Sequence, residues 1–154
     1  MNDAQLLLGN QICFPIYSAS RLITKAYKPY LQEMGLTYPQ YLVLMVLWEQ
    51  DAQSVNQIKE KLMLNTNTLS PLLKRMEKRG LLQRIRSSQD ERSVILQLTD
   101  TGKQLKSKAL PIPEKLIKEI LSRNIQLEDM LKLKDILNEL IVALSPNGET
   151  CKQD

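Results

Sequence analysis

The sequence predicts a mainly α-helical fold that carries one small β-hairpin. Apolar residues recur at helical spacing through most of the 154 residues, whereas residues 83–87 and 94–98 alternate between polar and apolar positions. A polar stretch separates these two alternating segments, as in a hairpin. The length, with 43% hydrophobic and 25% charged residues, indicates one globular domain over residues 1–154.

The first predicted helix covers residues 14–34. Pro15 is tolerated only in a first turn, so this helix should begin near Cys13 or bend there. Pro29 predicts a bend or an early end, and Gly35 closes the segment.

The next two helices are predicted from their capping residues. Thr37 and Gln40 form a capping box, and so do Ser54 and Gln57. The apolar run over residues 41–48 fits either a buried strand or a buried helix, and its capped start favours the helix.

A further helix follows a short break at residues 63–65 and is stopped by Gly80. Its apolar residues recur at i, i+3, i+4 and i+7, and they are Leu69, Leu72, Leu73 and Met76. The hairpin comes next, with residues 88–91 as its polar tip. A helix that starts at residues 99–100 is interrupted by two prolines, and a final amphipathic helix covers residues 127–144.

Helix, turn, helix and hairpin in this order predict a winged helix-turn-helix over residues 37–98. The segments 6–35 and 99–144 carry apolar stripes, and a single chain has too few other residues to bury them. We therefore expect these two segments to form a helical dimerisation region in a homodimer.

Composition excludes several classes of function. The chain has no histidine, so His-dependent catalysis and His-ligated metal sites are excluded, and its two cysteines cannot build a thiolate zinc site. We expect no metal, no cofactor and no enzymatic activity. The longest apolar run is far too short for a membrane span, and no basic-then-apolar leader opens the chain, so a cytoplasmic location without membrane contact is expected.

Positive charge is concentrated in the middle of the chain. The formal net charge is +4, yet residues 59–92 alone carry nine Lys or Arg against four Asp or Glu. Such a basic footprint is typical of binding to a phosphate backbone, although a solvated helix face explains the charge equally well.

The helix that begins somewhere in residues 66–68 has a face opposite its apolar stripe that favours DNA binding over a solvated surface. It has small polar residues at its N-terminal end and cations further along, which suits base edges and phosphates in a major groove. There we expect Thr66, Asn67, Thr68, Ser70, Pro71, Lys74 and Arg75. We expect Arg86, Asp90 and Arg92 to serve the wing, with Asp90 orienting Arg92 toward a minor groove.

Residues 64–77 (LNTNTLSPLLKRME) resemble the recognition helix of MarR-type transcriptional regulators, and Asp90-Glu91-Arg92 resembles their D-x-R wing tip. Gln11-Ile12-Cys13-Phe14 with Tyr17, and residues 36–44 (LTYPQYLVL), are similar to the OhrR group, which senses organic hydroperoxides. The resemblance covers residues 6–144. It implies a homodimer that binds an inverted-repeat operator in double-stranded DNA.

Cys13 is a candidate redox centre, although an unpaired cysteine is more often a small buried hydrophobe. Its place near a helix N-terminus favours a thiolate, and Tyr17 lies one turn away on the same face. Tyr27 is fourteen residues on, or roughly 21 Å along a continuous helix, so it cannot reach Cys13 of its own chain. In the OhrR group two tyrosines of the partner subunit hydrogen-bond the reactive cysteine, and the resemblance places them at Tyr27 and Tyr38.

The resulting hypothesis is a repressor that an organic hydroperoxide inactivates by oxidising Cys13 to sulfenic acid or a mixed disulfide. One alternative is a MarR-type regulator gated by a small aromatic or phenolic ligand, and a less favoured one is a thiol peroxidase. The sequence departs from the OhrR pattern at Pro15, where alanine or serine is expected. Cys151 does not match the resolving cysteine of two-cysteine members, so we expect an inert surface thiol there.

Overall fold

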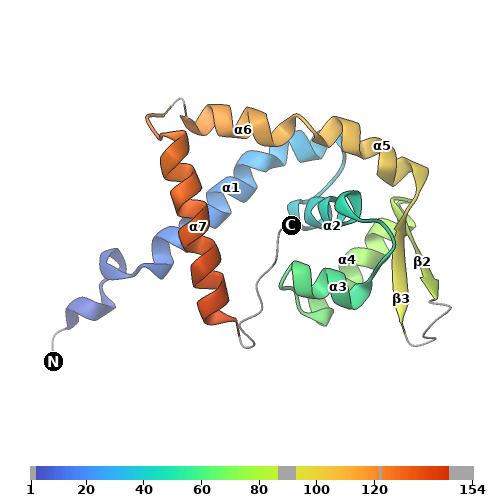
Figure 1. The fold of residues 1–154 in the computed structure, drawn as a ribbon, viewed down its shortest axis with the longest axis horizontal. Coiled ribbons are helices and arrows are strands. Elements are labelled where there is room, and N and C mark those ends of the chain that lie inside the picture. Colours follow the sequence, from blue (N-terminus) through green and yellow to red (C-terminus); the bar gives the residue numbers. More distant parts are fainter. Residues whose placement is uncertain (1–2, 87–92, 122, 146–154) are drawn as a thin grey trace. The chain divides into compact units, whose positions relative to one another are not determined.

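The computed structural model describes residues 3–86, 93–121 and 123–145 of the chain. The chain divides into two compact units, residues 1–112 and 113–154 (Figure 1). The predicted mainly α-helical fold with a small β-sheet is confirmed. Within the described ranges, no helix combines the length and apolarity needed to cross a membrane.

A long helix opens the first unit after two short 3-10 helices. These are η1 (Asp3–Leu6) and η2 (Leu8–Asn10), and helix α1 follows over Cys13–Glu33. Pro15 lies in the first turn of α1, as predicted. Pro29 lies inside α1 without ending it, so the predicted early end is wrong. The loss of one N–H donor weakens a single turn, and the turns on either side continue the helix.

The turn after α1 is closed by Gly35, which has a φ of +63°. The Leu36 N–H donates to the Leu31 carbonyl at 2.8 Å, and the Gly35 N–H donates to the Gln32 carbonyl at 2.9 Å. This pair of bonds is a Schellman motif, which requires the left-handed conformation that glycine adopts without strain.

The apolar run over residues 41–48 is helical and forms the centre of the first unit. Helix α2 covers Tyr38–Glu49 and buries Val43, Leu44 and Leu47 almost completely. Its start is capped as predicted, because the Thr37 N–H donates to Gln40 Oε1 at 3.0 Å. The strand interpretation of this run is therefore wrong.

The predicted helix-turn-helix is present as α3 (Val55–Lys61) and α4 (Thr66–Lys78). Ser54 and Gln57 cap α3 reciprocally. The Ser54 N–H donates to Gln57 Oε1 with an N–O distance of 2.8 Å, and the Gln57 N–H donates to Ser54 Oγ with an N–O distance of 3.2 Å. Gly80, with a φ of +66°, follows α4 and ends it.

The sheet contains one strand more than the sequence predicts. β2 (Leu82–Arg86) and β3 (Val94–Leu98) form the predicted antiparallel hairpin, with Leu82 opposite Leu98. The predicted strand began one residue later, at residue 83. A two-residue strand, β1 (Gln53–Ser54), pairs with the other edge of β3 and gives the order β1-β3-β2.

Helix α5 (Asp100–Ala109) packs tightly against the start of the hairpin. Thr99 caps it by accepting a hydrogen bond from the Gly102 N–H at 3.1 Å. Trp48 Nε1 donates to the Gly102 carbonyl at 3.0 Å, so α2 also contacts this turn. A side chain at Gly102 would overlap the Leu81 carbonyl oxygen.

The second unit contains most of α6 (Ile112–Leu121) and all of α7 (Leu127–Leu144). The predicted interruption lies between α5 and α6, where Pro111 precedes α6 and Pro113 lies in its first turn, and the bounds of α7 are as predicted. Two exposed i,i+4 ion pairs, Glu114–Lys118 and Glu128–Lys132, lie along these helices. No residue of α7 is buried, and its exposed apolar side chains are Leu127, Leu131, Leu133, Ile136, Leu140, Ile141 and Leu144.

Replacing Gly102 by alanine should destabilise the first unit, because the new Cβ meets backbone rather than a movable side chain. We expect Gly102→Ala to lower the free energy of unfolding by at least about 2 kcal/mol in urea denaturation at fixed protein concentration. Gly9→Ala is the matched control, since nothing lies within 4 Å of a Cβ at that position. Equal stabilities of the two variants would contradict the packing described for Gly102.

Candidate functional site

Helix α4 has one buried face and one exposed face, as the sequence predicts. Its four apolar residues, Leu69, Leu72, Leu73 and Met76, are buried. Thr66, Asn67 and Thr68 form the exposed first turn, and the Asn65 side chain caps that turn by accepting from the Thr68 N–H at 2.9 Å. The hydrogen-bonding side chains at the start of α4 therefore lie free of the core.

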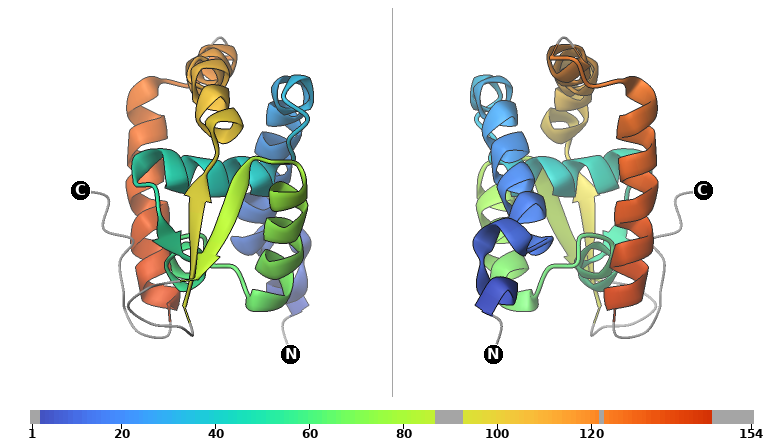
Figure 2. Two further views of the ribbon diagram at one scale, coloured as in Figure 1. Left: turned by 90° about the vertical axis from the view of Figure 1, so that its right-hand side faces the viewer. Right: turned by 90° about the vertical axis from the view of Figure 1, so that its left-hand side faces the viewer.

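Cations extend this surface along α4 toward its C-terminal end. Lys74 and Arg75 are exposed, as is Pro71, and Ser70 is half-buried at the edge of the face. β2 packs against α4 (Figure 2). It carries Arg86, which is exposed. The predicted wing residues Asp90 and Arg92 lie outside the described residues, as does Cys151.

Cys13 is the first residue of α1, and its thiol is exposed and free. One turn further on, the exposed Tyr17 hydroxyl accepts a hydrogen bond of 2.7 Å from Arg21 Nη1. The Arg21 guanidinium also lies 5.5 Å from the centre of the Tyr17 ring. Because Tyr17 accepts from Arg21, its own hydroxyl proton remains available to a neighbouring acceptor.

Four aromatic side chains form a cluster between α1 and α2. The ring centres of Tyr27 and Tyr38 are 5.1 Å apart, and Tyr41 lies 5.7 Å from Tyr27 and 6.3 Å from Tyr38. Trp48 packs edge-on against Tyr41 at 6.1 Å. The structure thus brings Tyr27 and Tyr38 together in one chain.

Burial raises the pKa of all three clustered tyrosines. Desolvation is the main cause of the raised pKa at Tyr27 and Tyr38. At Tyr41, desolvation and the electrostatic effect of the other two phenols raise the pKa to about 12. Phenols with raised pKa values stay protonated near neutral pH and act as hydrogen-bond donors.

The structure does not bring Cys13 and Tyr27 together. They lie on one unbroken helix, fourteen residues apart, so about 21 Å of helix separates them. The sequence-based argument that Tyr27 cannot reach Cys13 of its own chain is confirmed. The sequence analysis missed the contact of Arg21 with Tyr17, although their i,i+4 spacing in a helix was a usable signal.

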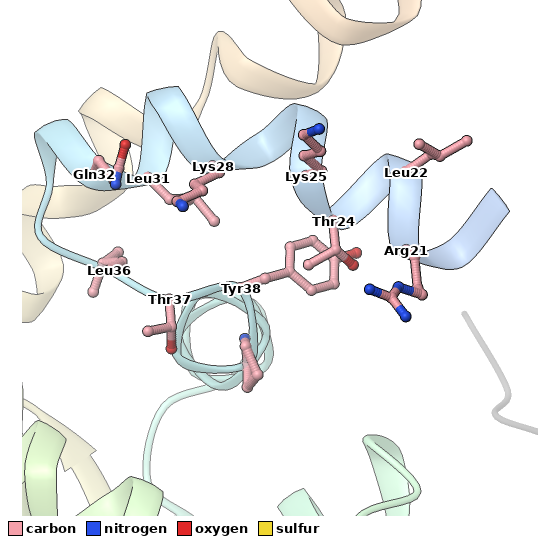
Figure 3. Close-up of a pocket in the computed structure, with 11 residues that line it drawn as sticks. Arg21, Leu22, Thr24, Lys25, Lys28, Leu31, Gln32, Leu36, Thr37 and Tyr38 are labelled. Carbon is pink, nitrogen blue, oxygen red and sulfur yellow. The ribbon is translucent and has the colours of Figure 1, made fainter. Parts of the chain in front are cut away.

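A pocket of about 690 Å³ lies between α1 and the start of α2 (Figure 3). Its α1 side presents Arg21, Lys25 and Lys28, and Leu36 and Tyr38 complete the wall on the other side. Tyr38 therefore belongs to both the pocket and the aromatic cluster. Within the described ranges, His, Cys, Asp and Glu form no group of three or more that could hold a metal ion.

Comparison with known proteins identifies relatives over nearly the whole chain. The family described as "Transcriptional regulator SarA/Rot" matches residues 25–109. The "Organic hydroperoxide resistance transcriptional regulator" of Bacillus subtilis (strain 168) is 47% identical over 137 residues, covering 89% of this chain and 91% of that protein.

Solved structures of one further relative, AbfR of Staphylococcus epidermidis, share the fold. Reduced AbfR bound to DNA is 37% identical, with a TM-score of 0.74 and coverage of 94% of this chain and 96% of that chain. Overoxidised AbfR bound to DNA is 36% identical, with a TM-score of 0.70 and coverage of 94% and 100%.

The buried phenol of Tyr41 predicts an alkaline loss of stability. An unfolded tyrosine loses its proton near pH 10, whereas folded Tyr41 keeps it to about pH 12. The unfolded state therefore binds fewer protons between these values, and the free energy of unfolding should fall as pH rises through this window.

We expect Tyr41→Phe to remove on the order of 2 kcal/mol of this fall, measured by urea denaturation from pH 9 to pH 12. Tyr17→Phe is the control, because Tyr17 is exposed. The same pH dependence in the Tyr41→Phe variant and the wild type would contradict the assignment.

Proposed function

The chain belongs to the MarR-type family of DNA-binding transcriptional regulators, with close similarity to the organic hydroperoxide regulators, and we propose that it is a repressor switched by oxidation of Cys13. Proteins of this family regulate transcription and are not enzymes. One observation carries the redox proposal. A single unbroken helix presents an exposed thiol at its first residue and holds Tyr27 against Tyr38 far from that thiol.

DNA recognition is assigned to the exposed face of α4 and to the hairpin. The residues proposed for the major groove are Thr66, Asn67, Thr68, Ser70, Pro71, Lys74 and Arg75, with Arg86, Asp90 and Arg92 at the wing. In a two-fold dimer the two α4 helices must be spaced by one turn of DNA, about 34–36 Å. A change in this spacing lowers the affinity for an inverted repeat.

The proposed dimer covers the apolar surfaces that a single chain leaves exposed. Phe14, Tyr17 and Leu22 on α1 are 42%, 57% and 64% exposed, and α7 has a row of exposed leucine and isoleucine side chains. Burying such surface is the main driving force for stable association between subunits. Residues 6–35 and 99–144 are therefore proposed as the dimerisation region.

Dimerisation also supplies the partners of the thiol. Tyr27 and Tyr38 of one subunit are proposed to donate hydrogen bonds to Cys13 of the other, while Tyr17 donates from the same chain. The raised pKa values of Tyr27 and Tyr38 keep these two phenols protonated as donors at neutral pH, and charge-assisted hydrogen bonds stabilise a thiolate. The α1 N-terminus adds the favourable end of the helix dipole.

The proposed reaction begins with attack of the Cys13 thiolate on the distal oxygen of an organic hydroperoxide. The S–O bond forms as the O–O bond breaks, and the departing alkoxide takes up a proton and leaves as an alcohol. The cysteine is thereby oxidised to sulfenic acid and the peroxide is reduced. A small cellular thiol can then condense with the sulfenic acid, giving a mixed disulfide and water.

The pocket between α1 and α2 supports a second candidate function, gating by a small anionic aromatic ligand. Its three cations, Arg21, Lys25 and Lys28, suit a carboxylate or phenolate, and its apolar wall suits a ring. In that case DNA release would need a ligand and no cysteine.

The decisive test is fluorescence anisotropy of an inverted-repeat DNA with reduced wild-type protein and with Cys13→Ser, each challenged with cumene hydroperoxide. We expect both proteins to bind DNA. The wild type should lose at least about tenfold in affinity after oxidation, a typical size for coupling between two sites, and Cys13→Ser should lose none.

The relative AbfR has been crystallised on DNA in an overoxidised form, so the oxidant is added in steps to avoid overoxidation of Cys13. Dithiothreitol should then restore DNA binding, because it reduces sulfenic acid and mixed disulfides. Cys151→Ser serves as the control for the second thiol. Equal release from the wild type and Cys13→Ser would contradict redox control, and tight binding without release from either would favour the ligand-gated alternative.

Mixed dimers test whether the tyrosines act across the subunit interface. One dimer combines a Tyr38→Phe chain with a Cys13→Ser chain. The other combines a wild-type chain with a chain that carries both substitutions. Each dimer has one Cys13 and one Tyr38, but only in the first does the remaining cysteine face a partner that retains Tyr38.

We expect the single Cys13 of the first dimer to react about tenfold faster with cumene hydroperoxide than that of the second. This factor corresponds to one hydrogen bond to a charged group. Quenched-flow alkylation of the residual thiol gives both rates. The reverse order of rates would place the tyrosine in the same chain as its cysteine.

A further inference from the structure

An arginine at the end of the proposed recognition helix contacts the turn after α1. Arg79 is the C-terminal cap residue of α4. Its Nη1 donates to the Gly35 carbonyl, and its Nη2 lies 3.4 Å from the Met34 carbonyl. These contacts join positions 44 and 45 residues apart in the sequence, both within the first unit.

Main-chain carbonyls at the end of α1 are a favourable place for a guanidinium. The last carbonyls of a helix lack partners within it and lie at the negative end of the helix dipole. Two donors of the planar Arg79 group reach two successive carbonyls, an arrangement that a lysine ammonium cannot reproduce with the same geometry. The contact therefore joins the end of α1 to the end of α4.

Gly35 leaves the space that this contact occupies. A Cβ at position 35 would lie 2.8 Å from Arg79 Nη2, closer than real Cβ contacts allow. A side chain at position 35 would therefore displace the Arg79 guanidinium, and the φ of +63° also favours glycine there. Leu36, the next residue, is buried, and Thr37 and Tyr38 begin α2 directly after it.

Arg79 thus connects the two parts of the molecule to which sensing and DNA binding are assigned. Helix α1 carries Cys13 at its start and Tyr27 near its middle, and it is about 31 Å long. Helix α1 is unbroken, so Cys13 and the Arg79 contact lie at opposite ends of one continuous helix. Helix α2 packs against both α1 and α4 and offers a second, apolar route.

We propose that Arg79 is the positioning residue that transmits the rearrangement at oxidised Cys13 from α1 to α4. This inference rests on the proposed redox function. Oxidation changes the hydrogen bonds at Cys13, α1 shifts, and the Arg79 contact moves the C-terminal end of α4. Without that contact, α4 keeps its DNA-binding position when Cys13 is oxidised.

The test compares Arg79→Gln with Lys78→Gln. Both variants lose one positive charge from the same end of α4, and Lys78 is an exposed neighbour. For each full-length dimer, the dissociation constant for DNA is measured before and after stoichiometric oxidation, and mass spectrometry gives the extent of Cys13 modification.

We expect Lys78→Gln to keep the wild-type ratio of oxidised to reduced dissociation constants, whatever its absolute affinity. Arg79→Gln should be modified at Cys13 at the wild-type rate, yet its ratio should fall by at least about fivefold. A wild-type ratio in Arg79→Gln, with or without a lower melting temperature, overturns the proposal and leaves Arg79 a merely structural residue.

A second pair of variants keeps the test independent of the arginine substitution. Gly35→Ala and Gly80→Ala place a side chain at nearly equal φ values of +63° and +66°, but only the Cβ at position 35 meets Arg79. We expect the ratio to fall in Gly35→Ala alone, and equal ratios in the two variants contradict the proposal.

A wild-type protein that keeps its DNA after Cys13 oxidation overturns the proposed function as well, so the two failures are distinguishable.

Discussion

The continuity of α1 is the constraint on which the proposed sensor depends. Twenty-one residues from Cys13 to Glu33 form one helix, despite the proline at position 29. A helix of this length keeps its two ends apart, so the exposed thiol and the Tyr27–Tyr38 pair cannot combine within one chain. Any site that uses both must be built from two chains. Dimerisation then becomes part of the chemistry as well as of DNA recognition.

Helix α4 combines a face that packs in the core with a face that is proposed to contact DNA. Its apolar stripe is buried, and most residues of its opposite face are exposed. The Asn65 cap satisfies a first-turn N–H with a side chain. The polar side chains of that turn are therefore not used up by the helix terminus and remain available for base edges.

Local features of the fold were predictable from the sequence, because their causes lie within a few residues. The capping boxes at Thr37 and Ser54, the stop at Gly80 and the bounds of α7 all follow from spacing over one or two turns. The early end that Pro29 predicted is wrong, because the helix continues to Glu33 although the proline weakens it locally. The two faces of α4 followed from helical periodicity alone.

Features that join distant residues were not predictable in the same way. Strand β1 is only two residues long, and its buried Gln53 donates to the Gln50 and Val46 carbonyls at the end of α2, so no alternating pattern marks it. The Arg79 contact crosses more than forty residues and has no sequence signature. The clustering of Tyr27 and Tyr38 likewise depends on how α1 and α2 pack.

The two candidate functions converge on one structural element. Tyr38 belongs to the aromatic cluster and also lines the cationic pocket, and it lies at the start of α2, directly after the turn that Arg79 contacts. In the redox proposal Tyr38 is a hydrogen-bond partner of the thiol, and in the ligand-gated alternative it lines the occupied pocket, so each proposal assigns its input to a residue beside this turn. The output would in either case pass from the turn to α4, because the Arg79 contact is the same. In both proposals the input residues lie on α1 and at the start of α2, whereas the contact of Arg79 with the Gly35 and Met34 carbonyls is separate from them.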